Sequence, residues 1–385
     1  MKRTSLLLGV VCIFLVTACT NQDDTLEYDK EMKRHSLISS AYEEKDVPTK
    51  KQITLAAVGD MLIHDRVYRD AQTEDGYDFK PMLKEVKPYL DHPTVTFANQ
   101  ETMIGGDGLP VASYPSFNSP VEVGDALKHM GVDVVSIANN HTLDHGEVAI
   151  QHATRHWNEI DMMYVGAHKD KKDRNELRIY NTEEGISVAF LAYTYGTNGI
   201  PVPDGKDYLV NLINRKQMKQ DIAEATERAD VVVLSLHFGK EYKRMPSKEQ
   251  KSLAQFAADQ GVDVILGHHP HVLQPVDWVE GAEGNKTFVA YSLGNFLSGQ
   301  YDHYRRIGGV LQLTIVKDEQ DQGVVEVTSP KFLPTYVKDD QENDYRVLPM
   351  FSLSNDILPD AKEHYEKIKN HIAQWTPELE FIEEK

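Results

Sequence analysis

The chain has 385 residues, and 41 lysine and arginine residues against 60 aspartate and glutamate residues give it a formal net charge of −19. Nucleic-acid binding depends on basic side chains that displace counterions from phosphates, so we expect no nucleic-acid partner for so acidic a chain. Hydrophobic residues make up 41% of the chain, which is typical of a globular protein with a sizeable core. The two cysteines are Cys12 and Cys19, so disulfides and cysteine-based zinc sites are excluded from the remaining chain.

The first nineteen residues have the features of a bacterial secretory signal. Lys2 and Arg3 precede an apolar run over residues 6–18, which is short for a membrane-spanning helix. The small residues before Cys19 resemble a lipobox, in which this cysteine carries diacylglycerol and becomes the new N-terminus. We expect residues 1–18 to be a signal peptide and Cys19 to anchor the protein at the extracytoplasmic face of the cell membrane. A plain signal or anchor in which Cys19 has no role remains the alternative.

Three further regions follow from composition. Residues 19–51 are polar and charged without sustained apolar periodicity, which predicts a flexible tether. Residues 52–316 are expected to form the main domain, and residues 317–385 a C-terminal extension of strands and a helix.

In the main domain, short apolar segments alternate with longer amphipathic ones, which predicts an α/β fold with a sheet covered by helices. The strands are predicted at residues 53–58, 94–98, 132–138, 186–193, 231–236, 262–266, 287–291, 310–316 and 324–328, the last two antiparallel. The helices are predicted at residues 79–89, 121–130, 148–160, 214–229, 247–260 and 359–375.

Polar residues follow five of the predicted strands directly. Because ligands of open α/β sheets collect at the carboxyl ends of the strands, we expect these side chains to converge on one site. Carboxylates, an amide and imidazoles form an oxygen and nitrogen ligand set that suits Mn, Fe, Zn or Ni better than a thiolate-binding metal. The candidate metal ligands are Asp60, Glu101, Asn140, His237, His269 and His271.

Two of these segments also have a purely structural explanation. Pro270 fixes the backbone between His269 and His271, so a rigid turn can direct both imidazoles to a metal or anion, or into the core. The polar run over residues 139–146 can cap a loop as well as form a site.

Six motifs, in order, resemble those of the CapA/PgsA family of poly-γ-glutamate (capsule) synthesis proteins, over about residues 52–315. The resemblance implies a calcineurin-like metallophosphatase fold, which is a two-sheet α/β sandwich flanked by helices (α/β/β/α). It also implies an extracytoplasmic role in the synthesis, export or anchoring of polyglutamate. The motifs are Gly59-Asp60-Met61-Leu62, Asn99-Gln100-Glu101, Ala138-Asn139-Asn140-His141 with Asp144-His145-Gly146, Leu236-His237-Phe238-Gly239, Gly267-His268-His269-Pro270-His271-Val272 and Tyr291-Ser292-Leu293-Gly294-Asn295-Phe296.

The resemblance also implies roles for single residues. It makes Asp60, Asn140 and the three histidines ligands of one or two divalent ions, Mn, Fe or Zn, with Glu101 as the bridging carboxylate. It makes His141 the general acid or phosphate contact, and Ser292 and Asn295 substrate-binding residues. The sequence departs from the usual Asp-x-His because position 62 is leucine, which leaves His64 as the alternative ligand. The usual Gly-Asp-x-x-Asp motif is replaced by Asn99-Gln100-Glu101.

The sequence leaves three functions open. The first is a membrane-anchored accessory protein of a polyglutamate synthase complex, with a metallophosphatase-like site that binds an anionic polymer. The second is a metal-dependent phosphoesterase or other hydrolase of the cell envelope, and the third is a non-catalytic scaffold. Five basic residues lie in loops after site motifs and form either an anion-binding patch or ordinary solvated surface: Lys240, Lys243, Arg244, Arg305 and Arg306.

Overall fold

The computed structural model describes residues 50–384, with the exception of residues 107 and 322. The predicted signal peptide, Cys19 and nearly all of the predicted tether therefore lie outside the described residues. Within residues 50–384, no helix combines the length and the apolar character needed to cross a membrane.

The first large sheet has the strand order β16-β15-β14-β1-β4-β5-β6, with β13 beside β1 and β17 beside β15. Its strands are β1 (Lys50–Leu62), β4 (Val95–Gln100), β5 (Val134–Ser136), β6 (Met163–Val165), β13 (Asn295–Ser298), β14 (Ile307–Asp318), β15 (Val324–Asp340), β16 (Asn343–Pro349) and β17 (Glu380–Phe381).

The second large sheet has the order β11-β12-β10-β9-β8-β7, and a small hairpin pairs β2 (Gln72–Thr73) with β3 (Gly76–Tyr77). The strands of the second sheet are β7 (Arg178–Asn181), β8 (Ser187–Thr194), β9 (Val231–His237), β10 (Val264–His268), β11 (Leu273–Glu280) and β12 (Lys286–Leu293).

The helices account for most of the predicted amphipathic segments. They are α2 (Asp65–Asp70), α3 (Lys80–Leu83), α4 (Pro88–Asp91), α5 (Glu122–His129), α6 (Gly146–Glu159), α7 (Lys171–Arg174), α8 (Arg215–Arg228), α9 (Lys248–Ala258) and α10 (Ala361–Ile372), with 3-10 turns η1 (His303–Arg306) and η2 (Met350–Ser352). The single helix predicted over residues 79–89 is wrong, because two short helices lie there. Pro88 occupies the first turn of α4 and cannot donate the backbone hydrogen bond that a continuous helix needs.

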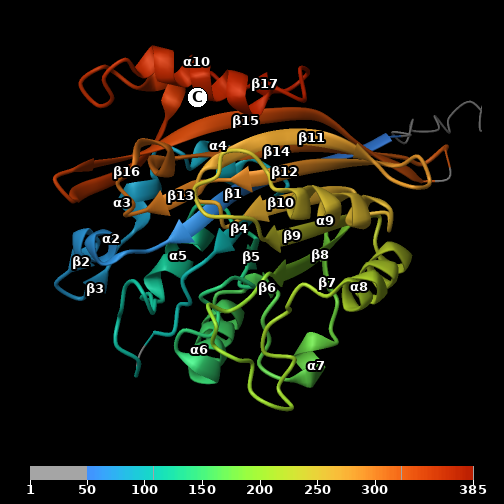
Figure 1. The fold of residues 1–385 in the computed structure, drawn as a ribbon, viewed down its shortest axis with the longest axis horizontal. Coiled ribbons are helices and arrows are strands. Elements are labelled where there is room, and N and C mark those ends of the chain that lie inside the picture. The colour runs from blue at the N-terminus through green and yellow to red at the C-terminus, as the bar shows by residue number, and fades with distance from the viewer. Residues whose placement is uncertain (1–49, 107, 322, 385) are drawn as a thin grey trace, which may run out of the picture. The chain divides into compact units, whose positions relative to one another are not determined.

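Apolar residues form three cores that define four layers. The core between the two sheets contains the stacked rings of Phe97 and Phe190, whose centroids lie 6.0 Å apart. Trp157 of α6 belongs to the core on the outer face of the first sheet, and Met218 of α8 to the core on the outer face of the second. The α/β/β/α arrangement is therefore confirmed. Helix α10, drawn in red in Figure 1, adds Ile368 to the core between the sheets and contacts β11 and β15.

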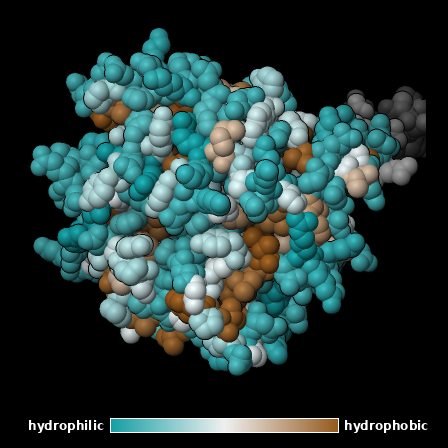
Figure 2. Space-filling view, in the orientation of Figure 1, coloured by the Kyte–Doolittle hydropathy of each residue, from teal (hydrophilic) through white to brown (hydrophobic). Residues whose placement is uncertain are grey.

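The parallel strands bring their carboxyl ends to one edge of the two sheets. In the first sheet Asp60 of β1 is paired with Asn99 of β4, and in the second His268 of β10 is paired with His237 of β9. Hydrophilic residues cover most of the face in Figure 2, and apolar residues show in smaller patches between them. The polar side chains at the strand ends are, in contrast, almost fully buried.

Candidate metal centre

The structure brings the six predicted metal ligands together. Asp60 lies near the end of β1, Glu101 directly after β4 and Asn140 in the turn after β5. His237 ends β9, while His269 and His271 form the turn between β10 and β11. All six side chains are buried. Convergence of the strand ends, which we expected from the α/β pattern, is confirmed.

Two overlapping groups of these residues have the spacing of a metal site. Asp60, Glu101 and His237 form one group, and Glu101, His269 and His271 form the other. Within each group the nitrogen and oxygen atoms lie within 4.8 Å of one another. Glu101 belongs to both groups, which is the placement expected of a carboxylate shared by two adjacent ions.

The remaining contacts hold these side chains in a fixed arrangement. Asn99 Nδ2 donates to Asp60 Oδ1 at 2.8 Å, and His271 Nδ1 lies 3.0 Å from Asp60 Oδ2. His237 Nε2 lies 2.7 Å from Asn140 Oδ1. Asp60 and His237 therefore have hydrogen-bond partners, whereas Glu101 has only longer contacts: its Oε1 lies 3.5 Å from His237 Nε2 and 3.7 Å from His271 Nε2.

Both carboxylate oxygens of Glu101 are buried without a hydrogen-bond partner among the described residues, as is Nδ1 of His269. A buried polar atom without a partner is costly, and most such atoms in folded proteins are paired. A divalent cation accepts carboxylate and imidazole ligands together. The residues present therefore fit a divalent metal ion at this position.

The surroundings shift the pKa values of the candidate ligands in different directions. Burial raises the pKa of Glu101 well above its usual value. Burial also acts to raise the pKa of Asp60, but the neighbouring His268 and His271 outweigh it through their close contacts and charges, so the pKa is lowered. Although burial opposes it, the charge of Glu101 and the contact with Asp60 raise the pKa of His271 to about 9.

The other two histidines of the cluster are held neutral. Burial and the neighbouring His271 lower the pKa of His269 to about 3, and burial together with His269 lowers that of His237 well below its usual value. Neutral imidazole is the form that binds metal ions. These two side chains therefore already have the metal-binding protonation state at neutral pH.

The turn that presents His269 and His271 has an unusual backbone. Both residues adopt positive φ angles, 95° for His269 and 57° for His271. Residues other than glycine rarely adopt such angles. Such conformations persist only where the surroundings enforce them, and they concentrate at functional sites. Pro270 alone, on which the sequence prediction relied, does not account for this geometry.

Residues 54–300 match the family model described as "Bacterial capsule synthesis protein PGA_cap". The chain belongs to this family. It is 30% identical over 260 residues to the capsule biosynthesis protein CapA of Bacillus anthracis, a match that covers 65% of this chain and 61% of that protein. It is 31% identical over 209 residues to the PGA biosynthesis protein CapA of Bacillus subtilis (strain 168), covering 52% of this chain and 51% of that one.

The chain thus spans about half to three fifths of the length of these curated relatives. Among solved structures, it is similar to the calcineurin-like phosphoesterase YfkN from Bacillus subtilis, with 15% identity and a TM-score of 0.41. That similarity covers 83% of this chain and 99% of the other. The predicted resemblance to the capsule synthesis family is confirmed.

His141 of this family member is oriented by an acidic neighbour. Its Nδ1 lies 2.7 Å from Asp144 Oδ2, and its ring meets that of Phe117 edge-on at 4.7 Å. Asp144 is itself fixed, because its carboxylate accepts the backbone N–H of Phe117 at 2.7 Å. Nε2 is therefore the ring nitrogen of His141 that remains available to a ligand.

The two predicted substrate-binding residues occupy different surroundings. Asn295 Oδ1 lies 3.2 Å from His271 Nδ1, and its Nδ2 donates to the carbonyl of Arg305 at 2.8 Å. Ser292 is buried, and its hydroxyl accepts the backbone N–H of Gly294 at 3.3 Å. A substrate-binding role for these two residues stays a prediction.

His64 belongs to neither metal-binding group. Its Nδ1 lies 3.0 Å from the carbonyl oxygen of Leu62 and 3.3 Å from the backbone nitrogen of Gly299. Its ring packs against Phe117 with 5.3 Å between the centroids, so Phe117 lies between His64 and His141.

Several residues at the site were missed. His268 is buried with its Nδ1 3.6 Å from Asp60 Oδ1, and neither ring nitrogen has a hydrogen-bond partner among the described residues. Its position in a run of histidines at a strand end was a usable signal. Tyr195, whose ring lies 4.6 Å from that of His269, and Asn198 come from the loop after β8, where the sequence carries no motif.

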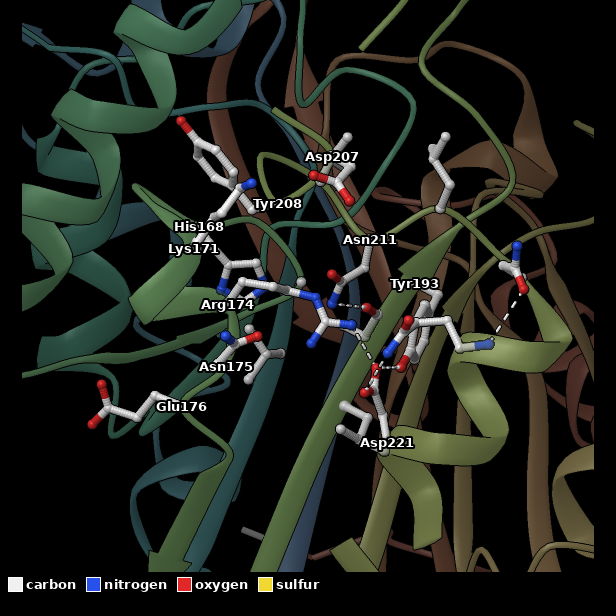
Figure 3. Close-up of a pocket in the computed structure, with 18 of the residues that line it drawn as sticks. His168, Lys171, Arg174, Asn175, Glu176, Tyr193, Asp207, Tyr208, Asn211 and Asp221 are labelled. Atoms are coloured by element: carbon white, nitrogen blue, oxygen red, sulfur yellow. Dashed lines mark hydrogen bonds and ion pairs between the residues drawn. The ribbon is translucent and has the colours of Figure 1, made fainter. Parts of the chain in front are cut away.

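A separate cavity of about 710 Å³ lies beside the edge of β8 and contains none of the predicted metal ligands. Figure 3 shows Arg174 and Tyr193 both directed at Asp221, with His168 nearby. The loop over residues 195–213 connects this cavity to the metal centre. Val202 to Leu212 of this loop contribute to the cavity wall, whereas Asn198 contacts Asn140 and His141.

Proposed function

We propose that the protein is an accessory protein in the synthesis, export or anchoring of poly-γ-glutamate or a related cell-surface polymer. Membership of the capsule synthesis family and the similarity to the two CapA proteins support this proposal. We propose further that the strand-end cluster is a divalent metal site that acts on the polymer or on an intermediate. The observation that carries this second part is Glu101, whose two buried oxygens have no hydrogen-bond partner among the described residues although two ligand groups meet there.

The chain's own residues would perform four tasks at this site. Asp60, Glu101, Asn140 and the histidines 237, 269 and 271 would hold the metal. When bound, divalent cations polarise a phosphoryl or carboxyl oxygen and make water a better nucleophile at neutral pH. His141, with Nδ1 beside Asp144, is placed to donate a proton from Nε2 to a leaving oxygen. Asn99 and Asn295 orient Asp60 and His271, and burial keeps bulk water out of the cluster.

The same geometry favours a second candidate, a metal-dependent phosphoesterase of the cell envelope. The observation behind it is the pair of His141 and Asp144 beside an oxygen and nitrogen ligand set, because a proton donor next to metal ligands suits hydrolysis of a phosphate ester. In either case we propose that Cys19 carries a lipid and holds the protein at the extracytoplasmic face of the membrane, with a synthase complex as its partner.

Metal analysis of the purified full-length chain tests the metal site. We expect bound Mn, Fe or Zn in the wild type and in the control His129→Ala, whose side chain is exposed on α5. Glu101→Ala and His269→Ala are expected to lose most of the metal. A wild type that binds no divalent metal contradicts the metal site.

The polymer role is tested by deleting the gene and restoring each variant. We expect less surface polymer in the deletion strain, recovery with wild type and His129→Ala, and no recovery with Glu101→Ala. Unchanged polymer in the deletion strain contradicts the accessory role. Full recovery by a metal-free Glu101→Ala protein would identify a scaffold instead of a metal-dependent enzyme.

A further inference from the structure

Arg244 is a cation that has no counter-charge among residues 50–384. It lies in the loop between β9 and α9, where its guanidinium carbon is 3.9 Å from the centre of the Tyr304 ring. Among residues 50–384, no carboxylate forms an ion pair with Arg244 and its guanidinium takes part in no hydrogen bond. The side chain is partly buried, and burial lowers its pKa. A partly desolvated guanidinium without an anion is unfavourable unless a ligand supplies one.

A second arginine lies beside it in a reciprocal arrangement. The guanidinium carbon of Arg305, in η1, lies 3.5 Å from the centre of the Tyr242 ring. The loop that carries Tyr242 and Arg244 is thus interlocked with the turn that carries Tyr304 and Arg305. A guanidinium that lies over an aromatic ring still presents N–H groups at its edge, which can bind an oxyanion; one of those of Arg305 is paired with Asp302.

The competing acidic groups are weak partners. Arg305 Nη2 is 2.8 Å from Asp302 Oδ2, but the Asp302 side chain is 68% exposed, so the pair contributes little. Glu241, in the same loop as Arg244, is exposed, and burial together with the charge of Glu241 raises the pKa of the neighbouring Tyr242 to about 12. Arg306 is different, because its side chain already pairs with Asp339 and donates to the carbonyl of Val337. Of the predicted basic patch, Arg306 is therefore already neutralised.

Both arginines are tied to the metal centre. The backbone N–H of Tyr242 donates to the carbonyl of Pro270 at 2.8 Å, and the Tyr242 ring is 6.0 Å from that of His271. On the other side, Asn295 connects the two parts, since it lies 3.2 Å from His271 Nδ1 and donates to the carbonyl of Arg305. The Arg305 guanidinium therefore lies against the ring that contacts His271, and Arg244 follows in the same loop, two residues after Tyr242.

We propose that Arg244 and Arg305 form an oxyanion-binding subsite beside the metal centre, which takes the carboxylates of an acidic polymer. The choice of polymer rests on the proposed function, whereas the oxyanion chemistry rests on the two stacked guanidinium groups. A guanidinium recognises a carboxylate through two parallel hydrogen bonds, and it recognises phosphate in the same way. A local cationic subsite also explains how a chain with a net charge of −19 engages a polymer of the same sign.

The test measures binding of poly-γ-glutamate of defined length to the metal-loaded, full-length protein. We expect Arg244→Gln to weaken the Kd about tenfold, because hydrogen bonds between charged groups are among the strong ones, and Arg305→Gln to weaken it less. Arg244→Lys keeps the charge but not the fork of donors, so its Kd should lie between those of wild type and Arg244→Gln. Arg228→Gln is the matched control, since Arg228 is an exposed arginine of α8 that pairs with Glu224. Metal content and melting temperature should match the wild type in all variants.

Two further probes separate the possible sources of the oxyanion. Inorganic polyphosphate replaces the carboxylates by phosphates, and dextran is a neutral polymer that should not bind. If the protein binds polyphosphate in an Arg244-dependent way and does not bind polyglutamate, the result supports the oxyanion subsite and contradicts the polyglutamate part of the proposed function. Wild-type affinity of both Arg244→Gln and Arg244→Lys for both anionic polymers overturns the subsite. Binding of dextran as tight as that of polyglutamate overturns it as well.

Discussion

Asn140 has two neighbours that together determine which way its side-chain amide faces. Its Oδ1 lies 2.7 Å from His237 Nε2, and its Nδ2 donates to Asn198 Oδ1 at 3.1 Å. The contact with Asn198 directs the amide oxygen of Asn140 toward the candidate ligands. Groups that orient metal ligands in this way affect metal affinity although they do not contact the metal.

Asn198→Ala removes this orienting acceptor. We expect about tenfold to hundredfold weaker binding of the metal, because Asn140 then rotates freely about its side-chain bonds. Competition with a chelator of known affinity measures the change. Asn175→Ala, at the wall of the separate cavity, is the control and should bind metal as the wild type does. An Asn198→Ala protein with wild-type metal affinity would show that Asn140 needs no such support.

At the level of single residues, the sequence predicted those groups that directly follow a strand. This rule identified Asp60, Glu101 and His237, because an apolar strand followed by a polar residue is a local pattern. It did not identify Tyr195 and Asn198. Tyr195 contacts His269 from another strand end of the same sheet, and Asn198 contacts Asn140 at the end of a strand in the other sheet. Contacts between residues so far apart along the chain have no local signal in a single sequence.

Among the secondary-structure elements, the close contact between β1 and the turn before β13 positions Asp60. The backbone N–H of Asp60 donates to the carbonyl of Gly294 at 2.9 Å. A Cβ atom on Gly59 would lie only 1.9 Å from that carbonyl oxygen. A glycine is required here because no side chain fits between the two backbones.

Gly59→Ala is therefore expected to destabilise the protein by about 1–3 kcal/mol and to reduce its metal content, because Asp60 moves with the displaced strand. Urea unfolding and metal analysis measure the two effects. Gly196→Ala is the control, since nothing lies within 4 Å of the added methyl group. Normal metal content in a destabilised Gly59→Ala protein would show that the strand contact serves stability alone.

Asp263, directly before β10 and at the opposite end of that strand from His268, provides a test of pH dependence. Its carboxylate accepts the backbone N–H of Val232 at 2.7 Å, and burial raises its pKa from 3.8 to about 6. Between pH 4 and 6 the folded chain keeps a proton that the unfolded chain has lost. The free energy of unfolding therefore falls as the pH rises through this range.

Asp263→Asn keeps the acceptor oxygen but removes the charge. We expect it to stabilise the protein at pH 7 by up to about 3 kcal/mol, an upper bound because part of the side chain remains accessible to water. Denaturant unfolding at pH 4, 5, 6 and 7 should show the gain growing with pH. The control Asp259→Asn, at the exposed end of α9, should not change the pH dependence. A gain that is constant from pH 4 to 7 would contradict the titration of Asp263.

Several long elements were predictable, but length alone did not decide the outcome, because the short strand β5 lies within the predicted segment 132–138 whereas the longer strands β11 and β16 were missed. The apolar runs of β1, β8 and β9 and the amphipathic pattern of α8 were sufficient, because each buries a regular face. Strands β6 and β13 have three and four residues, too few to establish a period of two. Strands β15 and β16, by contrast, join the same sheet as β1, so part of the predicted extension completes that sheet.

For the whole molecule, net charge bears on the membrane attachment that we propose. A chain with a formal charge of −19 is not drawn to anionic lipids by its net charge. Within residues 50–384, no helix meets the requirements of a membrane span. The acylated cysteine proposed from the sequence is an anchor that does not depend on charge. Its membrane affinity comes from burial of the acyl chain, in which each methylene group contributes about 0.8 kcal/mol to the free energy of binding.

Lipidation at Cys19 is tested by growing cells with an alkyne analogue of palmitate and isolating the full-length protein. We expect the wild type to incorporate the label and Cys19→Ser to lose it, since the serine cannot form the thioether to diacylglycerol. Cys12→Ser is the matched control, because this cysteine lies inside the apolar run that we expect to be removed as a signal peptide. If Cys19→Ser retained the label, the proposed anchor at Cys19 would be contradicted. If Cys12→Ser lost the label, the lipid would be attached at Cys12 instead of Cys19. Stable anchoring requires two membrane-binding signals, and the two acyl chains of a diacylglycerol on one residue supply both. In Cys19→Ser, the loss of the label should therefore be accompanied by the loss of the diacylglycerol mass from the mature N-terminus.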